Sequence, residues 1–255
     1  MQFQKFTQIL QQYKYYPNAG DIVAGIILYK EHNGFFVDIG EKKAGYLPES
    51  EVLLLSKQHN TSNTMLLHIV REFFLITKHD EQSILSIKRL DYIRSWKRIK
   101  QFYKEDIIFN IVIEHINKGG IITYLEGIQG FIPKSHIYQE FIHYNKTKKI
   151  HCKLLTVQEY KNQLILSNKS ATLTLSIHKF KLGELVYGKI ILITSYGLFL
   201  NIYKIKALLH ISELSIEYAK HIYSHFYIQQ LIKVKITYIN SREGKLSVSQ
   251  KNIKN

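Results

Sequence analysis

The chain has 255 residues but only one cysteine and three prolines, and its 20 acidic residues are outnumbered by 35 lysines and arginines. The single cysteine, Cys152, excludes an internal disulfide framework and suits a reducing compartment. Its place in the mixed apolar and polar run 150–157 predicts a thiol buried in a strand rather than a nucleophile. No stretch approaches the ~20 apolar residues of a membrane span. We therefore expect no membrane partner.

The familiar motifs of catalysis and cofactor binding are also missing. The sequence contains no GxxxxGK[ST] loop, GxGxxG turn or GxSxG elbow, which argues against phosphate-loop, dinucleotide and serine-hydrolase chemistry. His221 and His225 have the spacing of zinc-binding helices, but no glutamate follows His221 and no third ligand is apparent. Glu49 and Glu51 are close, yet they lie in a repeated structural motif. We expect no enzyme, catalytic residue, metal, cofactor or small-molecule substrate.

The charge balance points to a polyanionic partner. A net charge of +15 and an isoelectric point near 9.6 are the electrostatic signature of a nucleic-acid binder. A genome rich in lysine codons would also make a chain basic, and the abundant isoleucine, lysine, asparagine and tyrosine fit that alternative in part. Charge alone therefore favours nucleic acid without establishing it.

One short pattern opens three segments of the chain, at 20–25, 105–110 and 183–188. Each segment closes on a similar tail, and the closing residues Ser86, Ser167 and Ser249 are 81 and 82 residues apart. A period this long is typical of tandem small domains rather than of a solenoid. Repeated domains usually bind something polymeric, because several weak contacts then add up to avidity.

Within these modules the apolar pattern has a period of two. In 231–238 the apolar residues at 232, 234, 236 and 238 alternate with lysines, which predicts a half-buried strand with a basic outer face. Five such short strands per module, separated by glycine and asparagine turns, favour a small closed barrel.

Helical spacing appears in two places. Apolar residues in 1–16 recur at helical intervals before Pro17, which predicts a short leading helix. The segment 91–103 is amphipathic and predicts a helical connector that docks on module one rather than touching RNA. The second linker, 170–176, is rich in serine and threonine without a helical period, so we expect it to be loose and to let module three move.

Module three carries the pattern with the most chemistry. Gly197 allows a tight turn, and Tyr196 and Phe199 can then project their rings beside His210 on one face. Aromatic faces among cations form a platform on which bases stack while lysines neutralise phosphates. The alternative is that these aromatic residues are ordinary barrel core.

The same residues resemble the S1 RNA-binding domain, a five-stranded OB barrel. The similarity rests on motifs in all three modules, at 20–25, 33–40, 45–51, 118–120, 127–136, 166–169, 183–190, 196–199, 209–214 and 245–249. Two further motifs, 71–74 and 93–96, resemble the ribosomal protein S1 family of the small subunit, of the cyanobacterial and plastid type. The resemblance spans nearly the whole chain.

In that family an aromatic platform and a neighbouring cation contact single-stranded RNA. On module three the resemblance implicates Tyr196, Phe199 and His210, with Lys245 as the cation and Asn240 where the family often has an aspartate.

The other two modules depart from the family pattern. Module one has Asn33 and Pro48 at two of the positions, which leaves Phe36. Module two has Gly119, Ile122 and Pro133 there, so RNA contact by this face is not expected. By resemblance, the first two modules would help to dock the protein on the ribosome.

We therefore predict an all-β chain of three tandem five-stranded OB-fold (S1-type) barrels, with a short N-terminal helix and a helical connector between modules one and two. The expected divisions are an N-terminal helix (1–17), module one (18–90), the connector (91–103), module two (104–169), a linker (170–179) and module three (180–251).

The expected function is that of an RNA-binding constituent of the small ribosomal subunit, which captures single-stranded mRNA for translation initiation. Its expected partners are that RNA and the subunit with its proteins. An RNA-binding accessory factor in RNA processing, stability or transcription is the alternative. The start of the chain has no features of a presequence, and the codon-like bias together with the resemblance favours a plastid stroma over a bacterial cytoplasm.

Overall fold

The computed structural model describes residues 16–52, 67–78, 82–138, 149–215, 218, 221–251 and 253. The chain divides into two compact units, Met1–Arg98 and Ile99–Asn255, and each is described by itself. Nearly all of the predicted leading helix, at 1–15, lies outside the described residues. Within the described ranges, no helix is long and apolar enough to cross a membrane.

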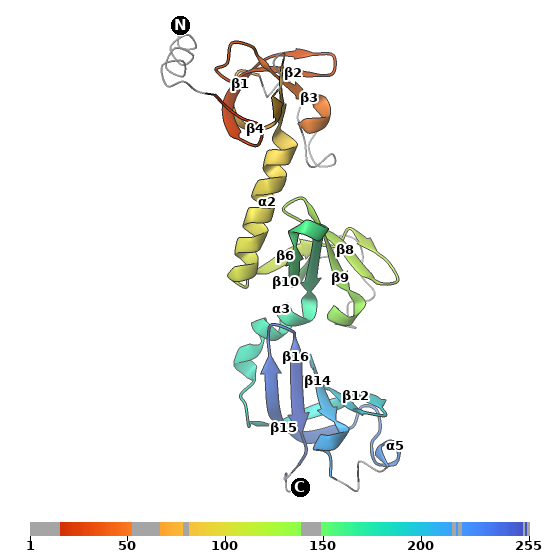
Figure 1. The fold of residues 1–255 in the computed structure, drawn as a ribbon. Coiled ribbons are helices and arrows are strands. Elements are labelled where there is room, and N and C mark those ends of the chain that lie inside the picture. Colours follow the sequence, from red (N-terminus) through yellow and green to blue (C-terminus); the bar gives the residue numbers. More distant parts are fainter. Residues whose placement is uncertain are drawn as a thin grey trace. The chain divides into compact units, whose positions relative to one another are not determined.

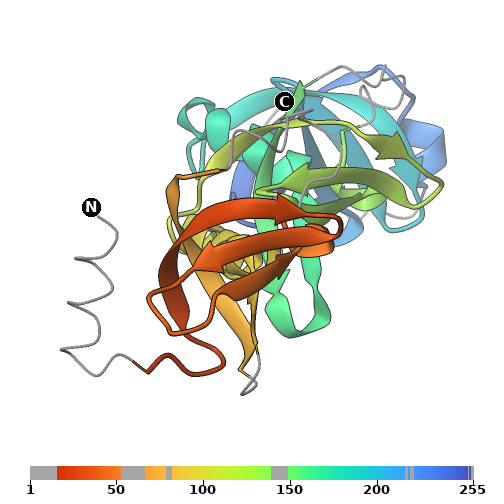
Figure 2. The same ribbon diagram turned by 90° about the horizontal axis from the view of Figure 1, so that it is seen from above.

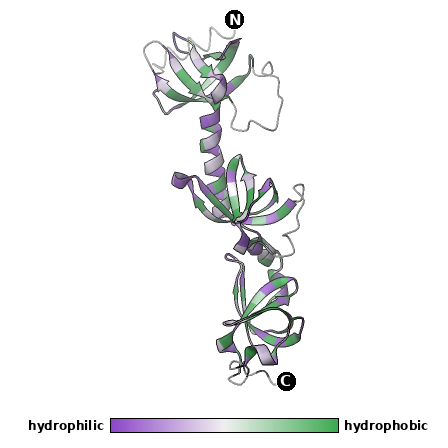
Figure 3. Cartoon of the chain, turned by 90° about the vertical axis from the view of Figure 1, so that its right-hand side faces the viewer, coloured by the Kyte–Doolittle hydropathy of each residue, from purple (hydrophilic) through white to green (hydrophobic). Residues whose placement is uncertain are grey.

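The first unit contains a closed five-stranded barrel with the strand order β1-β2-β3-β5-β4 (Figures 1 and 2). Its strands, with the 3-10 turn η1, are β1 (Ile22–Glu31), β2 (Gly34–Asp38), β3 (Gly45–Pro48), η1 (Glu49–Glu51), β4 (Val70–Lys78) and β5 (Ser83–Ser86). Alternate residues point inward, as a period of two requires, and Figure 3 shows the alternation along the strands. The buried set includes Val23, Ile27, Phe35, Val37, Leu47, Phe73, Leu75 and Leu85.

Helix α2 (Ile87–Lys104) follows β5 directly and confirms the helix predicted over 91–103. In the first unit, Arg94 of α2 forms an ion pair with Glu72 of β4, and Trp96 is completely buried. The apolar face of the helix therefore serves packing, and its first half contacts module one as the sequence predicts.

Module two is a curled six-stranded sheet of order β6-β10-β11-β9-β8-β7. Its elements are β6 (Ile108–Val112), β7 (His115–Ile116), β8 (Gly120–Leu125), β9 (Ile128–Pro133), η3 (Lys134–His136), β10 (Lys149–Gln158), η5 (Glu159–Lys161) and β11 (Gln163–Ser167). The expected first strand is broken into β6 and β7, which pair with β10 and β8 respectively. The Thr123 hydroxyl donates to the Val112 carbonyl oxygen at 2.8 Å and holds β8 beside the end of β6. Cys152 is buried in β10, as predicted, and burial raises the pKa of its thiol.

Module three is again a closed barrel, with the order β12-β13-β14-β16-β15. Its elements are η6 (Ile177–Lys179), β12 (Leu185–Thr194), β13 (Gly197–Ile202), β14 (Ile205–His210), η7 (Ile211–Glu213), α5 (Ile222–His225), β15 (Leu231–Asn240) and β16 (Lys245–Ser249). The predicted all-β class, with three small barrels or barrel-like sheets and few helices, is thus confirmed. The exact module boundaries remain a proposal.

The segment expected to be a loose linker begins instead with helix α3 (Asn168–Leu175). The Ser167 hydroxyl accepts a hydrogen bond from the Ser170 backbone N–H at 3.1 Å and caps the helix. Ala171 and Leu173 are completely buried. Serine and threonine have low helix propensity, but burial of these apolar residues against the neighbouring modules outweighs it. The prediction of a loose linker is wrong over this helix.

Candidate nucleic-acid interface

Two aromatic residues predicted to bind RNA lie together at the start of β13. The rings of Tyr196 and Phe199 have centroids 6.0 Å apart and meet edge to face at 87°. Tyr196 is 49% exposed and Phe199 is half-buried. Each ring therefore keeps part of its surface available for stacking, in contrast to the completely buried phenylalanines of the core. We call Tyr196 and Phe199 the aromatic platform.

Gly197 makes this arrangement possible. It lies opposite His210 in the β13–β14 pair, and a Cβ atom at Gly197 would come within 2.3 Å of the Leu209 carbonyl oxygen. No residue with a side chain fits at that distance without moving a strand. The backbone N–H of Ile211 donates to the Tyr196 carbonyl oxygen at 2.9 Å, so His210 is held beside the platform.

His210 is exposed, and its hydrogen bonds orient the ring. Its Nδ1 accepts from the Ser212 backbone N–H at 3.2 Å and lies 2.8 Å from the Ser212 hydroxyl. Because Nδ1 is an acceptor, the proton of the neutral imidazole lies on Nε2. His210 therefore presents an N–H donor to solvent, where it can meet a phosphate or a base edge.

Lys206, which is not among the predicted site residues, places a cation at the platform. The Lys206 Nζ lies 4.0 Å from the centroid of the Phe199 ring, which is a cation–π contact. Burial lowers the pKa of this lysine. The signal was present in the strand period, because residues 206, 208 and 210 of β14 share one face. Lys206 therefore lies on the same strand face as His210, close to the platform.

The other two predicted residues of module three lie at the turn between β15 and β16. The Lys245 Nζ is 2.5 Å from a carboxylate oxygen of Glu243, and this hydrogen bond and charge raise the pKa of Lys245. The Asn240 Oδ1 accepts from the Glu243 backbone N–H at 3.1 Å, and its Nδ2 donates to the Tyr238 hydroxyl at 3.0 Å. The Asn240 amide thus stabilises the turn. That Lys245 and Asn240 contact RNA stays a prediction.

The inward position assigned to residue 238 is wrong. Ile232, Val234 and Ile236 are buried, but Tyr238 is exposed. The pairing of β15 with β16 shifts register between Ile236 and Tyr238, and such a bulge reverses which face the next side chains occupy. Tyr238 is therefore one of the exposed rings of module three.

In module one the structure surrounds Phe36 with two further rings. Tyr29 and Tyr46 lie opposite Phe36 on the neighbouring strands β1 and β3. The Tyr29 ring is stacked on Phe36 at 5.0 Å, and the Tyr46 ring is tilted against it at 5.7 Å. The prediction names Phe36 alone, because the hairpin register that aligns the three rings cannot be read from the sequence. RNA contact by Phe36 remains a prediction, now supported by a row of aromatic rings.

Module two differs at the corresponding place. Ile122 of β8 lies opposite Phe131 of β9, whereas Phe199 holds the equivalent position of module three. An isoleucine offers no aromatic face for a base. Phe131 is half-buried on the same face, and the expectation that this face makes no RNA contact stays a prediction.

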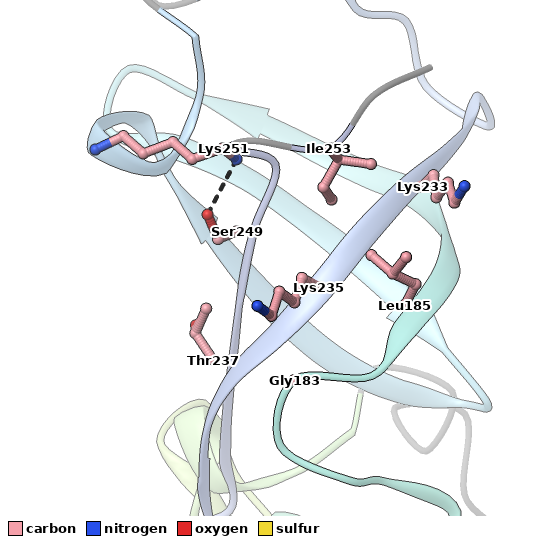
Figure 4. A pocket seen from close by; sticks show the side chains of 8 residues that line it. All are labelled: Gly183, Leu185, Lys233, Lys235, Thr237, Ser249, Lys251 and Ile253. Carbon is pink, nitrogen blue, oxygen red and sulfur yellow. Dashed lines mark hydrogen bonds between the residues drawn. The ribbon is translucent and has the colours of Figure 1, made fainter.

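A second basic surface of module three lies on other strands, β12, β15 and β16. A hollow of about 580 Å³ there is lined by Gly183, Leu185, Lys233, Lys235, Thr237, Ser249, Lys251 and Ile253. Figure 4 shows the Lys235 side chain lying across the hollow toward Thr237, while Lys233 and Lys251 point away on either side. The three ammonium groups do not converge, so the hollow has no enclosed pocket for a single anion.

The remaining candidates serve the fold. Glu49 pairs with Lys30 at 3.4 Å, and a Glu51 carboxylate oxygen accepts from the Ser86 hydroxyl at 2.6 Å, so the two acids have different partners. The His225 ring packs edge to face on Tyr218 at 5.2 Å. In the part of the chain that the structure describes, no three histidine, cysteine or acidic side chains gather to hold a metal.

Comparison with known proteins matches a domain family to module three and full-length relatives to nearly the whole chain. The family model of the S1 RNA-binding domain matches residues 179–251. The small ribosomal subunit protein bS1c of Pyropia yezoensis is 44% identical over 98% of this chain and 95% of its own length. The bS1 protein of a Synechococcus species is 33% identical over 97% of this chain and 81% of its own length.

A third relative, bS1c of Porphyra purpurea, is 43% identical over 98% of this chain and 95% of its own length. Among solved structures, GSP13 from Bacillus subtilis is 26% identical over 30% of this chain and 65% of that chain, with a TM-score of 0.26. Since relatives above 30% identity match this chain over almost its whole length, the chain belongs to the bS1 family of small ribosomal subunit proteins.

Proposed function

We propose that this chain is an RNA-binding constituent of the small ribosomal subunit that captures single-stranded mRNA for translation initiation. The observation that carries this proposal is the aromatic platform of module three, with Lys206 over Phe199 and the Nε2–H of His210 directed to solvent. The proposed role combines the RNA-binding chemistry of this site with the ribosomal name of the relatives.

The platform favours single strands. A base can lie on an aromatic ring only when its face is free, and in a duplex both faces are already stacked. The lysines contribute phosphate contacts that release counterions, so binding weakens as salt rises. Neither contact reads the edge of a base, which gives weak sequence preference.

The name of the relatives also supports a binding role rather than catalysis. Small ribosomal subunit proteins of this name match nearly the whole chain. The three modules and their connecting helices occupy that length, so we propose a protein without enzymatic activity of its own.

The relatives named bS1c come from Pyropia yezoensis, Porphyra purpurea and Spinacia oleracea. They favour a plastid stroma as the working compartment. The Synechococcus relative fits the alternative of a bacterial cytoplasm.

Two measurements test the proposal. Fluorescence anisotropy with a single-stranded RNA and its duplex should show clear preference for the single strand, and a Tyr196→Ala, His210→Ala variant should lose most of that affinity. Tyr227→Ala is the matched control, because Tyr227 is an exposed aromatic residue outside the strands of the platform. Equal affinity of the Tyr196→Ala, His210→Ala variant and the parent would exclude the platform as the RNA site.

Co-sedimentation with small ribosomal subunits at moderate salt tests the ribosomal part. The chain should travel with the subunits. RNA binding without co-sedimentation would instead support an accessory role in RNA processing, stability or transcription.

A further inference from the structure

Modules two and three meet through α3 inside the second unit. The Ser170 hydroxyl donates to the Ser241 carbonyl oxygen at 2.7 Å. Leu173 of α3 and Tyr138 both belong to the core cluster of the module three barrel. A Cβ atom at Gly244 would lie 2.7 Å from the Ser170 backbone nitrogen. The turn between β15 and β16 therefore rests directly on the start of α3.

Four basic side chains gather at this contact, and we call them the cationic joint: His136 of η3, Lys169 of α3, Lys206 of β14 and Lys245 of β16. Burial lowers the pKa of Lys169, and the charge of Lys206 lowers it further. Burial also lowers the pKa of His136, with further lowering by Lys169 and Lys245, while Glu243 opposes the shift. The geometry agrees: His136 Nδ1 lies 3.0 Å from the Ser167 hydroxyl, two residues before Lys169. A Cβ atom at Gly244, beside Lys245, would lie 2.9 Å from the Lys169 Cβ atom, so the four groups are neighbours although they come from two modules.

Negative charge is scarce at the cationic joint. Glu243 is ion-paired with Lys245. Among the residues that the structure describes, neither Lys169 nor Lys206 has an ion pair with a carboxylate. Both lysines are nevertheless partly exposed, so an anion from solution can reach them. Like charges held this close repel, and an anion bound between them would relieve the repulsion.

The cationic joint is continuous with the aromatic platform. Lys206 belongs to both, because its Nζ lies 4.0 Å from the centroid of Phe199. Strands β14 and β16 run parallel with Leu208 opposite Ser247, so Lys206 and Lys245 precede that pair by two residues each. A strand of RNA stacked on Phe199 would thus meet Lys206 first and the remaining members of the joint next.

We propose that the cationic joint binds phosphate groups of the RNA strand that leaves the aromatic platform, so that the bound RNA continues from module three onto α3 of module two. This inference rests on the proposed function, because it requires RNA on the platform. It gives module two a part in RNA binding through phosphates, although Ile122 stands where module three has the Phe199 ring. An acidic protein segment would satisfy the same charges, but the shared Lys206 favours RNA.

The test compares RNA lengths in the full chain. One labelled oligouridylate has about 4 nucleotides, enough for a single OB-type site, and the other has about 12, enough to pass the platform. Lys169→Gln should leave the affinity for the short strand unchanged. Each phosphate contact to a single strand adds about 0.7 to the slope with which log affinity falls against log salt. Loss of one contact should therefore weaken binding of the long strand about fivefold at about 0.1 M salt.

Two further variants separate the explanations. Lys169→Arg keeps the charge and should bind the long strand as the parent does, which distinguishes charge from packing of α3. Lys235→Gln removes one charge from the hollow on the other strands of module three and should leave the affinity for the long strand nearly unchanged. Thermal melting confirms that each variant is folded.

Several results would overturn the inference. The first is that Lys169→Gln and Lys235→Gln lose equal affinity for the long strand. The second is that Lys169→Gln loses equal affinity for both strands. The third is that Lys169→Arg loses as much affinity for the long strand as Lys169→Gln does. Loss of subunit co-sedimentation by Lys169→Gln with unchanged RNA affinity would assign the joint to an acidic protein partner instead. Failure of the platform itself is a separate result, because Tyr196→Ala would then bind the short strand as tightly as the parent.

Discussion

Replacing Phe199 with alanine removes one of the two rings of the aromatic platform. The ring lies 6.0 Å from that of Tyr196, and the Lys206 Nζ lies 4.0 Å from its centroid. One base stacked on an aromatic side chain contributes about 1–3 kcal/mol. Its loss corresponds to affinity lowered about 5- to 150-fold. Because Lys206 remains, the number of phosphates neutralised should not change, and the dependence of affinity on salt should stay that of the parent.

Fluorescence anisotropy with a short single-stranded RNA at several salt concentrations measures both quantities. Phe199→Tyr keeps a ring at this position and should bind nearly as the parent does, and Tyr227→Ala again serves as the control. Phe199 is half-buried, so its truncation should cost less stability than the about 3–5 kcal/mol of a fully buried phenylalanine. A folded Phe199→Ala variant with parental affinity, or one whose loss came wholly from a smaller salt slope, would refute base stacking at this ring.

Three further predictions concern stability. Gly197→Ala should lower the melting temperature of module three, because its Cβ atom would come within 2.3 Å of the Leu209 carbonyl oxygen; an unchanged melt in calorimetry would contradict this. Lys153 is buried and ion-paired with Asp106. Replacing it with alanine should lower the free energy of unfolding, measured in urea, by about 2–4 kcal/mol, and replacing it with methionine should lower it less, because methionine fills the space. The pKa of His136 is lowered by burial and nearby lysines from its ordinary 6.5, so the unfolded chain takes up this proton first. The contribution of neutral His136 to stability should therefore be complete above pH 6.5 and decline as the pH falls toward the lowered pKa. Urea unfolding between pH 7.5 and 5.5 should show that the unfolding free energy of the parent falls more steeply with decreasing pH than that of His136→Gln. An identical pH dependence of the two would count against this.

The errors of the sequence interpretation have identifiable physical causes. Alternation alone placed Tyr238 inside, and the bulge after Ile236 turned it outward. The composition of 170–176 predicted a loose linker, and burial of Ala171 and Leu173 made a helix of it. Lys206 was within reach of sequence reasoning, since it shares a strand face with His210. For Tyr238 and the linker a local pattern was read correctly, but a bulge or a contact distant in sequence decided the outcome.

The sequence by itself determined the threefold repeat, the all-β class and the positions of Tyr196, Phe199 and His210. These features are local, because strand period, turn glycines and short motifs are written in neighbouring residues. Only the tertiary structure decided that module two stays a curled open sheet and that Phe36 stacks with Tyr29.

The cationic joint also belongs to the tertiary structure. Its four residues, His136, Lys169, Lys206 and Lys245, are each more than 30 residues apart along the chain. They come together because α3 packs under the β15–β16 turn and because β14 pairs with β16, and such non-local contacts leave no periodic trace in the sequence.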